Sequence, residues 1–138
     1  RRGDVLVFGG ARRAFTQAMT EAGASLTDLD LLETHDCFTI AELLQYEAFG
    51  LTEVGKGASA IEDGRTHRGG ELPVNPSGGL KAKGHPIGAT GISQHVMAAL
   101  QLTGEAGQMQ IPDAALAGVF NMGGVAVANY FSVLERWR

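Results

Sequence analysis

The chain has 138 residues, of which 44% are hydrophobic and 19% charged, and its formal net charge is -4 at neutral pH. This length permits one domain with a hydrophobic core but not two, and the composition is that of an ordinary globular protein. The acidic balance gives no reason to expect a nucleic acid partner, and no apolar run approaches the roughly 20 residues of a membrane span.

The N-terminal part predicts a short lead-in followed by a helix. Residues 1–10 hold an apolar patch that is too short for a signal peptide, and residues 5–8 within it could pair as a short strand. Residues 11–22 carry apolar side chains at helical spacing, and Gly23 is well placed to end that helix. We therefore expect a lead-in at 1–10 and a single domain at 11–138.

A strand and a second helix follow. Residues 28–34 predict a strand that delivers the sequence HDCF, residues 35–38, to its carboxyl end. Thr39 and Glu42 match the S/T-x-x-E capping box of a helix N-terminus, and Gly50 is placed to end that helix. Residues 51–72 are glycine-rich and charged, and irregular stretches of this length are usually functional or packed against a partner.

The second half predicts a strand, a loop, a helix and a hairpin. A brief strand at 72–75 enters a glycine-rich loop at 75–91, and a helix spans about 88–103. Apolar runs at 115–121 and 125–135 read as two strands joined at Gly123 and Gly124. This alternation indicates an α/β layered domain with a mixed sheet, in which ligands gather at the carboxyl ends of strands.

The loop at 75–91, NPSGGLKAKGHPIGATG, is the first candidate for chemistry. It exposes backbone N–H groups, runs into a helix N-terminus and carries His85 at its turn. Free N–H groups, a positive helix end and an imidazole can together hold a developing oxyanion. The alternative is a structural loop whose glycines serve packing and whose histidine lies on the surface.

Cys37 in HDCF is the second candidate. It is the single cysteine, so an internal disulfide is excluded and a reducing, cytoplasmic location is expected. The following helix N-terminus and the nearby His35 predict a lowered thiol pKa. A raised pKa would instead favour the alternative, a small buried hydrophobic residue.

Asn121, at the start of the sequence NMGG, marks the third candidate. Glycines at a strand end could supply backbone N–H groups to an oxyanion hole, or could form only a hairpin turn. His67 and His95 are predicted to be solvated surface residues. One cysteine and four scattered histidines do not have zinc-site spacing, so no metal is expected.

Together these stretches resemble the C-terminal half of the thiolase superfamily, in particular its sterol-carrier-protein-2 type members. The resemblance rests on HDCF at 35–38, GGELPVNPSGGLKAKGHPIGATG at 69–91 and NMGGVAVANYFSVLE at 121–135. Their order and spacing also match, from about Ala11 to the end. The resemblance implies a layered α/β half-fold, a C-terminal βαβαβαββ domain that lacks its first strand, so that four strands remain.

The resemblance also implies roles for four residues. His85 looks like the histidine of the GHP motif, which hydrogen-bonds the thioester oxygen and helps to activate a nucleophilic cysteine. His35 stands where classical thiolases have an asparagine that organises the same oxyanion hole. Cys37 resembles an acid/base cysteine, and Gly123 a glycine whose N–H serves a second oxyanion hole. We expect these four residues to cluster within about 10 Å.

The sequence departs from the classical pattern at Asn121, which stands where that pattern has a cysteine. An asparagine side chain does not exchange a proton near neutral pH. Any acid/base duty would then fall to Cys37 or be absent.

The implied function is one half or subunit of an acyl-CoA acyltransferase, acting on 3-ketoacyl-CoA by Claisen condensation or thiolysis. A coenzyme A thioester is the expected substrate, no cofactor is covalently bound, and no coenzyme A contact is assigned. The N-terminal thiolase half, with the acyl-accepting cysteine, has no counterpart here. The chain is thus expected to be incomplete alone, as a fragment or a subunit, and to form a homo- or hetero-oligomer.

Two alternatives keep the fold but change the function. One is a thiolase-like retro-aldolase acting on steroid or other side-chain acyl-CoA thioesters with an OB-fold (DUF35-like) partner. The other is a non-catalytic assembly subunit, against which the retention of His35, Cys37 and His85 argues.

Overall fold

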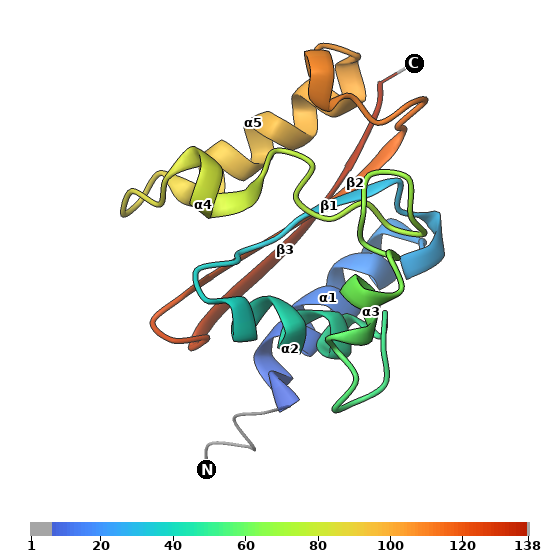
Figure 1. The fold of residues 1–138 in the computed structure, drawn as a ribbon. Coiled ribbons are helices and arrows are strands. Elements are labelled where there is room, and N and C mark those ends of the chain that lie inside the picture. The colour runs from blue at the N-terminus through green and yellow to red at the C-terminus, as the bar shows by residue number, and fades with distance from the viewer. Residues whose placement is uncertain (1–6, 138) are drawn as a thin grey trace.

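A computed structural model describes residues 7–137, which form a three-stranded sheet between two layers of helices (Figure 1). Strand β1 (Leu31–Glu33) pairs in parallel with β2 (Leu116–Gly123), which forms an antiparallel hairpin with β3 (Ala128–Glu135). Helices α1 (Gly9–Ala22) and α2 (Thr39–Phe49) pack on one face, and α5 (Thr90–Thr103) packs on the other. The expected α/β layered fold with a mixed sheet is therefore confirmed.

The two faces of the sheet follow from the alternation of side chains along β2. Ala117 and Val119 pack toward α5, whereas Phe120 and Met122 pack toward α1 and α2. Successive residues of a strand point to opposite faces, so one apolar strand can supply both cores. β1 is buried on both faces throughout its length.

Aromatic rings join α1 and α2 to the sheet. The ring centroids of Phe15 and Phe49 lie 5.1 Å apart, and Phe49 lies 5.2 Å from Phe120 and 5.5 Å from Phe131. Burial of such a side chain stabilises the fold by about 1.5–3 kcal/mol. This cluster fixes α2, whose first turn follows Cys37, against the sheet.

The N-terminal region differs from the predicted lead-in. Helix α1 begins at Gly9, two residues before the predicted start. The predicted strand at 5–8 is wrong where the structure describes it, because Val7 is in 3-10 helical conformation and Phe8 lies in a turn. Residues 5 and 6 lie outside the described residues. The predicted helix ends are confirmed, since Gly23 and Gly50 adopt the left-handed conformation that glycine tolerates.

The predicted capping box at the start of α2 is absent. Phe38 occupies the N-cap position, and no side chain caps the helix. Glu42 instead accepts a hydrogen bond of 2.5 Å from the hydroxyl group of Tyr46. A buried tyrosine hydroxyl requires a hydrogen-bond partner. Because the carboxylate of Glu42 is that partner, it does not bond to the backbone at the helix N-terminus.

The strands predicted at 28–34 and 72–75 are both shorter in the structure. Strand β1 begins at Leu31 rather than at residue 28, because residues 26–28 form a short 3-10 helix. The predicted strand at 72–75 reduces to one parallel bridge between Val74 and Leu32, so residues 7–137 form three strands rather than the four expected. The bridging segment still lies beside β1, since Asn75 donates its N–H to the carbonyl of Leu32 at 2.8 Å.

Short helices occupy the stretches predicted to be irregular. Helix α3 (Ser59–Glu62) lies in the glycine-rich stretch after α2, and α4 (Gly79–Lys83) lies within the loop at 75–91. The loop therefore contains a helical turn that its glycines and prolines did not predict. α4 ends two residues before His85, so its placement determines where that histidine lies.

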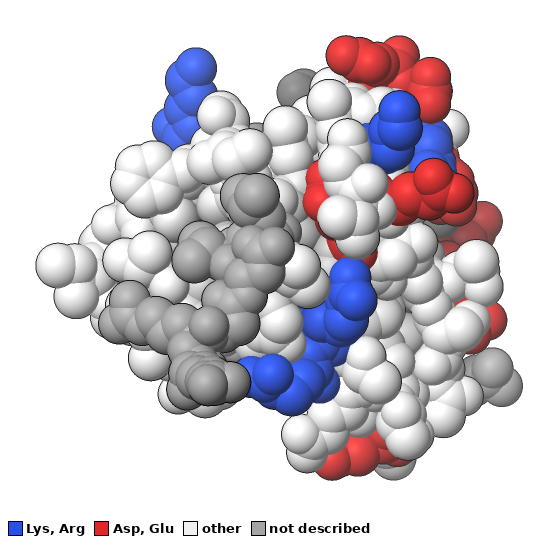
Figure 2. All heavy atoms as spheres, turned by 90° about the horizontal axis from the view of Figure 1, so that it is seen from below, with Lys and Arg blue, Asp and Glu red and all other residues white. Residues whose placement is uncertain are grey.

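The surface carries charges of both signs. On the face seen in Figure 2, acidic and basic side chains are interspersed, and a broad area is uncharged. None of the helices within residues 7–137 is long and apolar enough to cross a bilayer. In that same part of the chain, no group of three or more His, Cys, Asp or Glu side chains is arranged to hold a metal ion.

Candidate active site

A cavity of about 1320 Å³ opens where β1 and β2 reach their carboxyl ends. Its walls come from the HDCF segment, the loop before α5, one face of α5 and the β2–β3 hairpin. Most of its lining is apolar, with a few imidazole, thiol and amide groups. The structure brings all four predicted site residues to this lining: His35, Cys37, His85 and Gly123. Their catalytic roles stay predictions.

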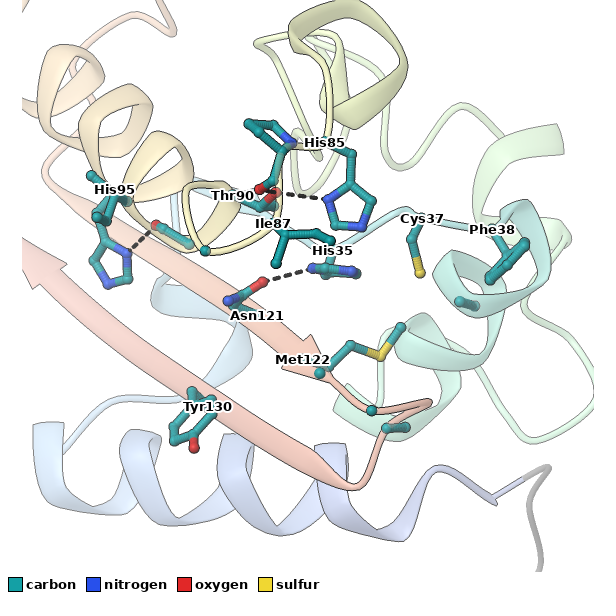
Figure 3. Close-up of a pocket in the computed structure, with 18 of the residues that line it drawn as sticks. His35, Cys37, Phe38, His85, Ile87, Thr90, His95, Asn121, Met122 and Tyr130 are labelled. Atoms are coloured by element: carbon teal, nitrogen blue, oxygen red, sulfur yellow. Dashed lines mark hydrogen bonds between the residues drawn. The ribbon is translucent and has the colours of Figure 1, made fainter.

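His35 lies two residues after the end of β1 and is buried. Its Nδ1 lies 2.6 Å from Oδ1 of Asn121, at the end of β2 (Figure 3). A carbonyl oxygen can only accept a hydrogen bond, so Nδ1 carries the proton and donates it. Burial lowers the pKa of His35, against the opposing effect of the Asn121 contact. The neutral ring therefore presents an unprotonated Nε2.

His85 packs against His35 in the lining of the cavity. The two ring centroids lie 4.8 Å apart in an edge-to-face arrangement, and both rings border the same space (Figure 3). Nδ1 of His85 lies 2.7 Å from Oγ1 of Thr90, a buried residue in the first turn of α5. This contact holds the ring through Nδ1 and leaves Nε2 toward the cavity.

Cys37 is half-buried beside the two imidazoles, and its predicted thiol pKa was wrong in direction. Burial raises the pKa of the Cys37 thiol, and the nearby charge of Asp36 adds to this rise. Backbone N–H groups of Phe38 and Cys37 act in the opposite direction but are outweighed. His35, being neutral, supplies no positive charge to favour a thiolate. Cys37 therefore stays protonated near neutral pH and is no activated nucleophile.

The hairpin turn begins one residue later than predicted. Gly123 is the last residue of β2, and the turn comprises residues 124–127, where Val125 and Ala126 have left-handed φ angles of 55° and 58°. Asn121 packs against α5, since a Cβ atom on Gly91 would lie 2.7 Å from Nδ2 of Asn121. A glycine at position 91 thus allows the amide to reach His35.

The other two histidines have different outcomes. His67 is exposed, as predicted. The prediction for His95 is wrong, because this residue is half-buried and bridges two elements: Nδ1 donates to the Gly91 carbonyl at 2.7 Å, and Nε2 lies 3.0 Å from Oγ of Ser132. His95 also lines the cavity. The sequence signal for this burial was the position of His95 one helical turn after Gly91, within a helix predicted to pack on the sheet.

Sequence reasoning missed three polar residues beneath the site. Thr90 holds His85, Asp36 accepts the N–H of Leu80 at 2.9 Å, and Glu33 is buried at the end of β1. No signal in the sequence separated Glu33 from Asp28 and Asp30, the other carboxylates of the strand predicted at 28–34. Its burial follows from its pairing in the fold, because charged residues are almost never fully buried unless they are paired.

The comparisons with known proteins identify the family of the chain. The sequence profile of a family described as "Thiolase C-terminal domain-like" matches residues 1–136. An acetyl-CoA acetyltransferase of Methanothermobacter thermautotrophicus is 50% identical over 83% of this chain and 29% of its own length. Human sterol carrier protein 2 is 44% identical over 82% of this chain and 21% of its own length.

A solved structure described as "Ltp2-ChsH2(DUF35) aldolase" matches with a TM-score of 0.79, covering 91% of this chain and 31% of that one. At 24% sequence identity, this likeness supports the fold alone. The chain spans between about a fifth and a third of the length of these relatives. The family profile and the identity to thiolase-like relatives agree: the chain belongs to the thiolase family and represents its C-terminal domain.

Proposed function

We propose that this chain is the C-terminal half of a thiolase-like enzyme that cleaves or forms the C2–C3 bond of a 3-ketoacyl-CoA. The observation that carries the proposal is the pair of facing imidazoles, His35 and His85, 4.8 Å apart in one apolar cavity. The cavity is large enough for part of an acyl-CoA, and no covalently bound cofactor enters the proposal.

In the thiolytic direction, a cysteine from the N-terminal half attacks the C3 ketone, and the C2–C3 bond breaks. His85 hydrogen-bonds the thioester oxygen and stabilises the enolate that leaves. The protonated thiol of Cys37 returns a proton to C2 of that enolate. The thiol of coenzyme A then takes the acyl group from the cysteine, which leaves as a thiolate, and the proton of that thiol restores Cys37. The raised pKa of Cys37 argues against Cys37 as the resting base and is also what a buried structural cysteine shows, so the proposal keeps Cys37 only as a proton donor.

The partner in this proposal is the N-terminal thiolase half, which covers an apolar surface beside the cavity. Ile87 is fully exposed, and Ile92 and Val96 on α5 are 69% and 51% exposed. Side chains of this kind rarely form a contiguous exposed patch on a monomer. We place the missing nucleophile over this surface, either in the same chain or in a partner subunit of an oligomer.

A second candidate reaction is retro-aldol cleavage of a 3-hydroxyacyl-CoA, and the tautomer of His35 favours it. The reaction begins when a base removes the 3-hydroxyl proton, and the unprotonated Nε2 of His35 can accept it. The C2–C3 bond then breaks to a carbonyl product, and Cys37 protonates C2 of the CoA enolate. No acyl-cysteine forms, so neither the nucleophile nor free coenzyme A is needed.

The requirement for coenzyme A separates the two reactions. Residues 1–138 would be fused to the N-terminal part of the Methanothermobacter acetyltransferase and assayed with 3-ketoacyl-CoA and 3-hydroxyacyl-CoA. The proposal expects cleavage of 3-ketoacyl-CoA only when free coenzyme A is present. Cleavage of 3-hydroxyacyl-CoA without free coenzyme A would establish the second candidate instead. If neither substrate is cleaved by the folded fusion, both proposals fail and a non-catalytic role remains.

A further inference from the structure

Glu33 is a fully buried carboxylate that the chemistry above does not use. It is the last residue of β1, two residues before His35. Its Oε2 accepts a hydrogen bond from Oγ of Ser77 at 2.8 Å and lies 2.9 Å from Nζ of Lys83, while its Oε1 accepts the N–H of Ser77 at 3.3 Å. All of these partners belong to the loop that carries His85.

Asp36, on the other side of His35, contacts the same loop. Its Oδ1 accepts the N–H of Leu80 in the first turn of α4 at 2.9 Å, and its carboxylate packs against Gly79. Lys83, which pairs with Glu33, is the last residue of α4. The two carboxylates that flank His35 therefore hold the two ends of α4.

Helix α4 leads directly to His85. Only Gly84, with a φ of 87°, separates Lys83 from His85, and the ring of His85 is held at its Nδ1 by Thr90. The chain between Lys83 and Thr90 is thus tied at both ends. Without the tie at Lys83, Thr90 alone would fix the ring, and residues 84–89 are exposed to solvent.

We infer that Glu33 and Lys83 are positioning residues, whose ion pair fixes α4 to β1 and thereby sets the ring of His85 against that of His35. A buried ion pair contributes little net stability compared with an apolar pair of the same volume. Its directional contacts, however, hold two segments in one arrangement, and small displacements of a reacting group reduce catalysis strongly. The ion pair therefore acts on catalysis through the placement of His85, and this consequence rests on the proposed function.

The geometric part is tested by NMR on the 138-residue chain, without any turnover. The chain has only four histidines, and each ring signal can be assigned by single substitution. A nuclear Overhauser effect between the rings of His35 and His85 is expected in the wild type. It should weaken or vanish in Glu33→Gln/Lys83→Met, which removes both charges and leaves no buried charge unpaired. The signal of the exposed His67 should not move.

Matched variants make the test specific. Lys81→Met removes an exposed lysine from the same short helix and should keep the ring-to-ring signal, as should Lys83→Arg, which keeps the charge. If the double variant does not fold, the single variant Glu33→Gln should show the same loss to a smaller degree. A ring-to-ring signal of wild-type strength in a folded charge-removing variant overturns the inference.

The catalytic part is tested in the fusion with the N-terminal thiolase half. Glu33→Gln/Lys83→Met should lower kcat about 10- to 100-fold with a smaller change in KM. Combined with His85→Ala, it should cause no further loss, because both changes remove the same group from its place. Additive losses would mean that the ion pair does not act through His85. An inactive wild-type fusion would reject the proposed function and leave the NMR result to decide on the positioning.

Discussion

Cys37 shows how one residue's environment decides its chemistry. A helix N-terminus and a histidine two residues away both predict a thiolate. In the folded chain, burial outweighs the backbone N–H groups, and Asp36 adds a negative charge on the same side. His35 is held neutral by its own burial. The thiol therefore stays protonated near neutral pH, and in the proposed reaction the nucleophile is a cysteine of the N-terminal half.

The rate of alkylation of Cys37 against pH checks this directly, because the chain has no other thiol. The pH at which the alkylation rate reaches half its maximum should lie above the ordinary thiol pKa of about 8.5. In the same chain unfolded in urea, this midpoint should return to the ordinary thiol pKa. Since the unfolded thiol loses its proton first, the free energy of unfolding should fall as pH rises between the two midpoints. A folded midpoint below the unfolded one would contradict this account of the thiol.

At the scale of elements, the sequence predicted those parts of the fold that have strong periodicity or a turn signal. The helices ending at Gly23 and Gly50 and the two C-terminal strands were found because their apolar spacing and terminal glycines are local signals. Helix α4 was missed, since its glycines disfavour helix locally and its stability comes from Asp36 and Glu33, which are distant in sequence. The candidate site was found by motif, whereas the His35–Asn121 contact depends on β1 and β2 lying side by side.

Gly79 at the start of α4 tests how tightly this element is fitted to the HDCF segment. A Cβ atom there would collide with the carboxylate of Asp36, and the residue has a φ of 66°. Gly79→Ala should therefore destabilise the chain by about 2–4 kcal/mol, from backbone strain plus the lost Asp36 hydrogen bond. Gly50→Ala is the control, because its φ is 83° but no atom lies within 4 Å of the added Cβ. Its cost should be only about 1–2 kcal/mol. If thermal or urea unfolding gave the same loss of unfolding free energy for both variants, Asp36 would be able to move aside without cost.

At the scale of the whole molecule, the proposed function makes this chain one half of an active site. The imidazoles, the thiol and the hairpin converge on one cavity, while apolar side chains of the adjacent loop and of α5 remain exposed. The relatives are three to five times longer than the segment that matches them, in keeping with the shares of 21–31%. We therefore expect the 138-residue chain alone to show no turnover of 3-ketoacyl-CoA, because it lacks a nucleophile held over the cavity.

The most direct measurement compares kcat/KM for CoA-dependent cleavage of a 3-ketoacyl-CoA by the wild-type fusion and by its His85→Ala variant. His67→Ala is the control, since His67 is exposed and does not line the cavity. Loss of one oxyanion or acid/base contribution predicts a fall of about 10²- to 10⁴-fold for His85→Ala and no change for His67→Ala. An active fusion that keeps its kcat/KM after His85→Ala would contradict the claim that this cavity is the active site.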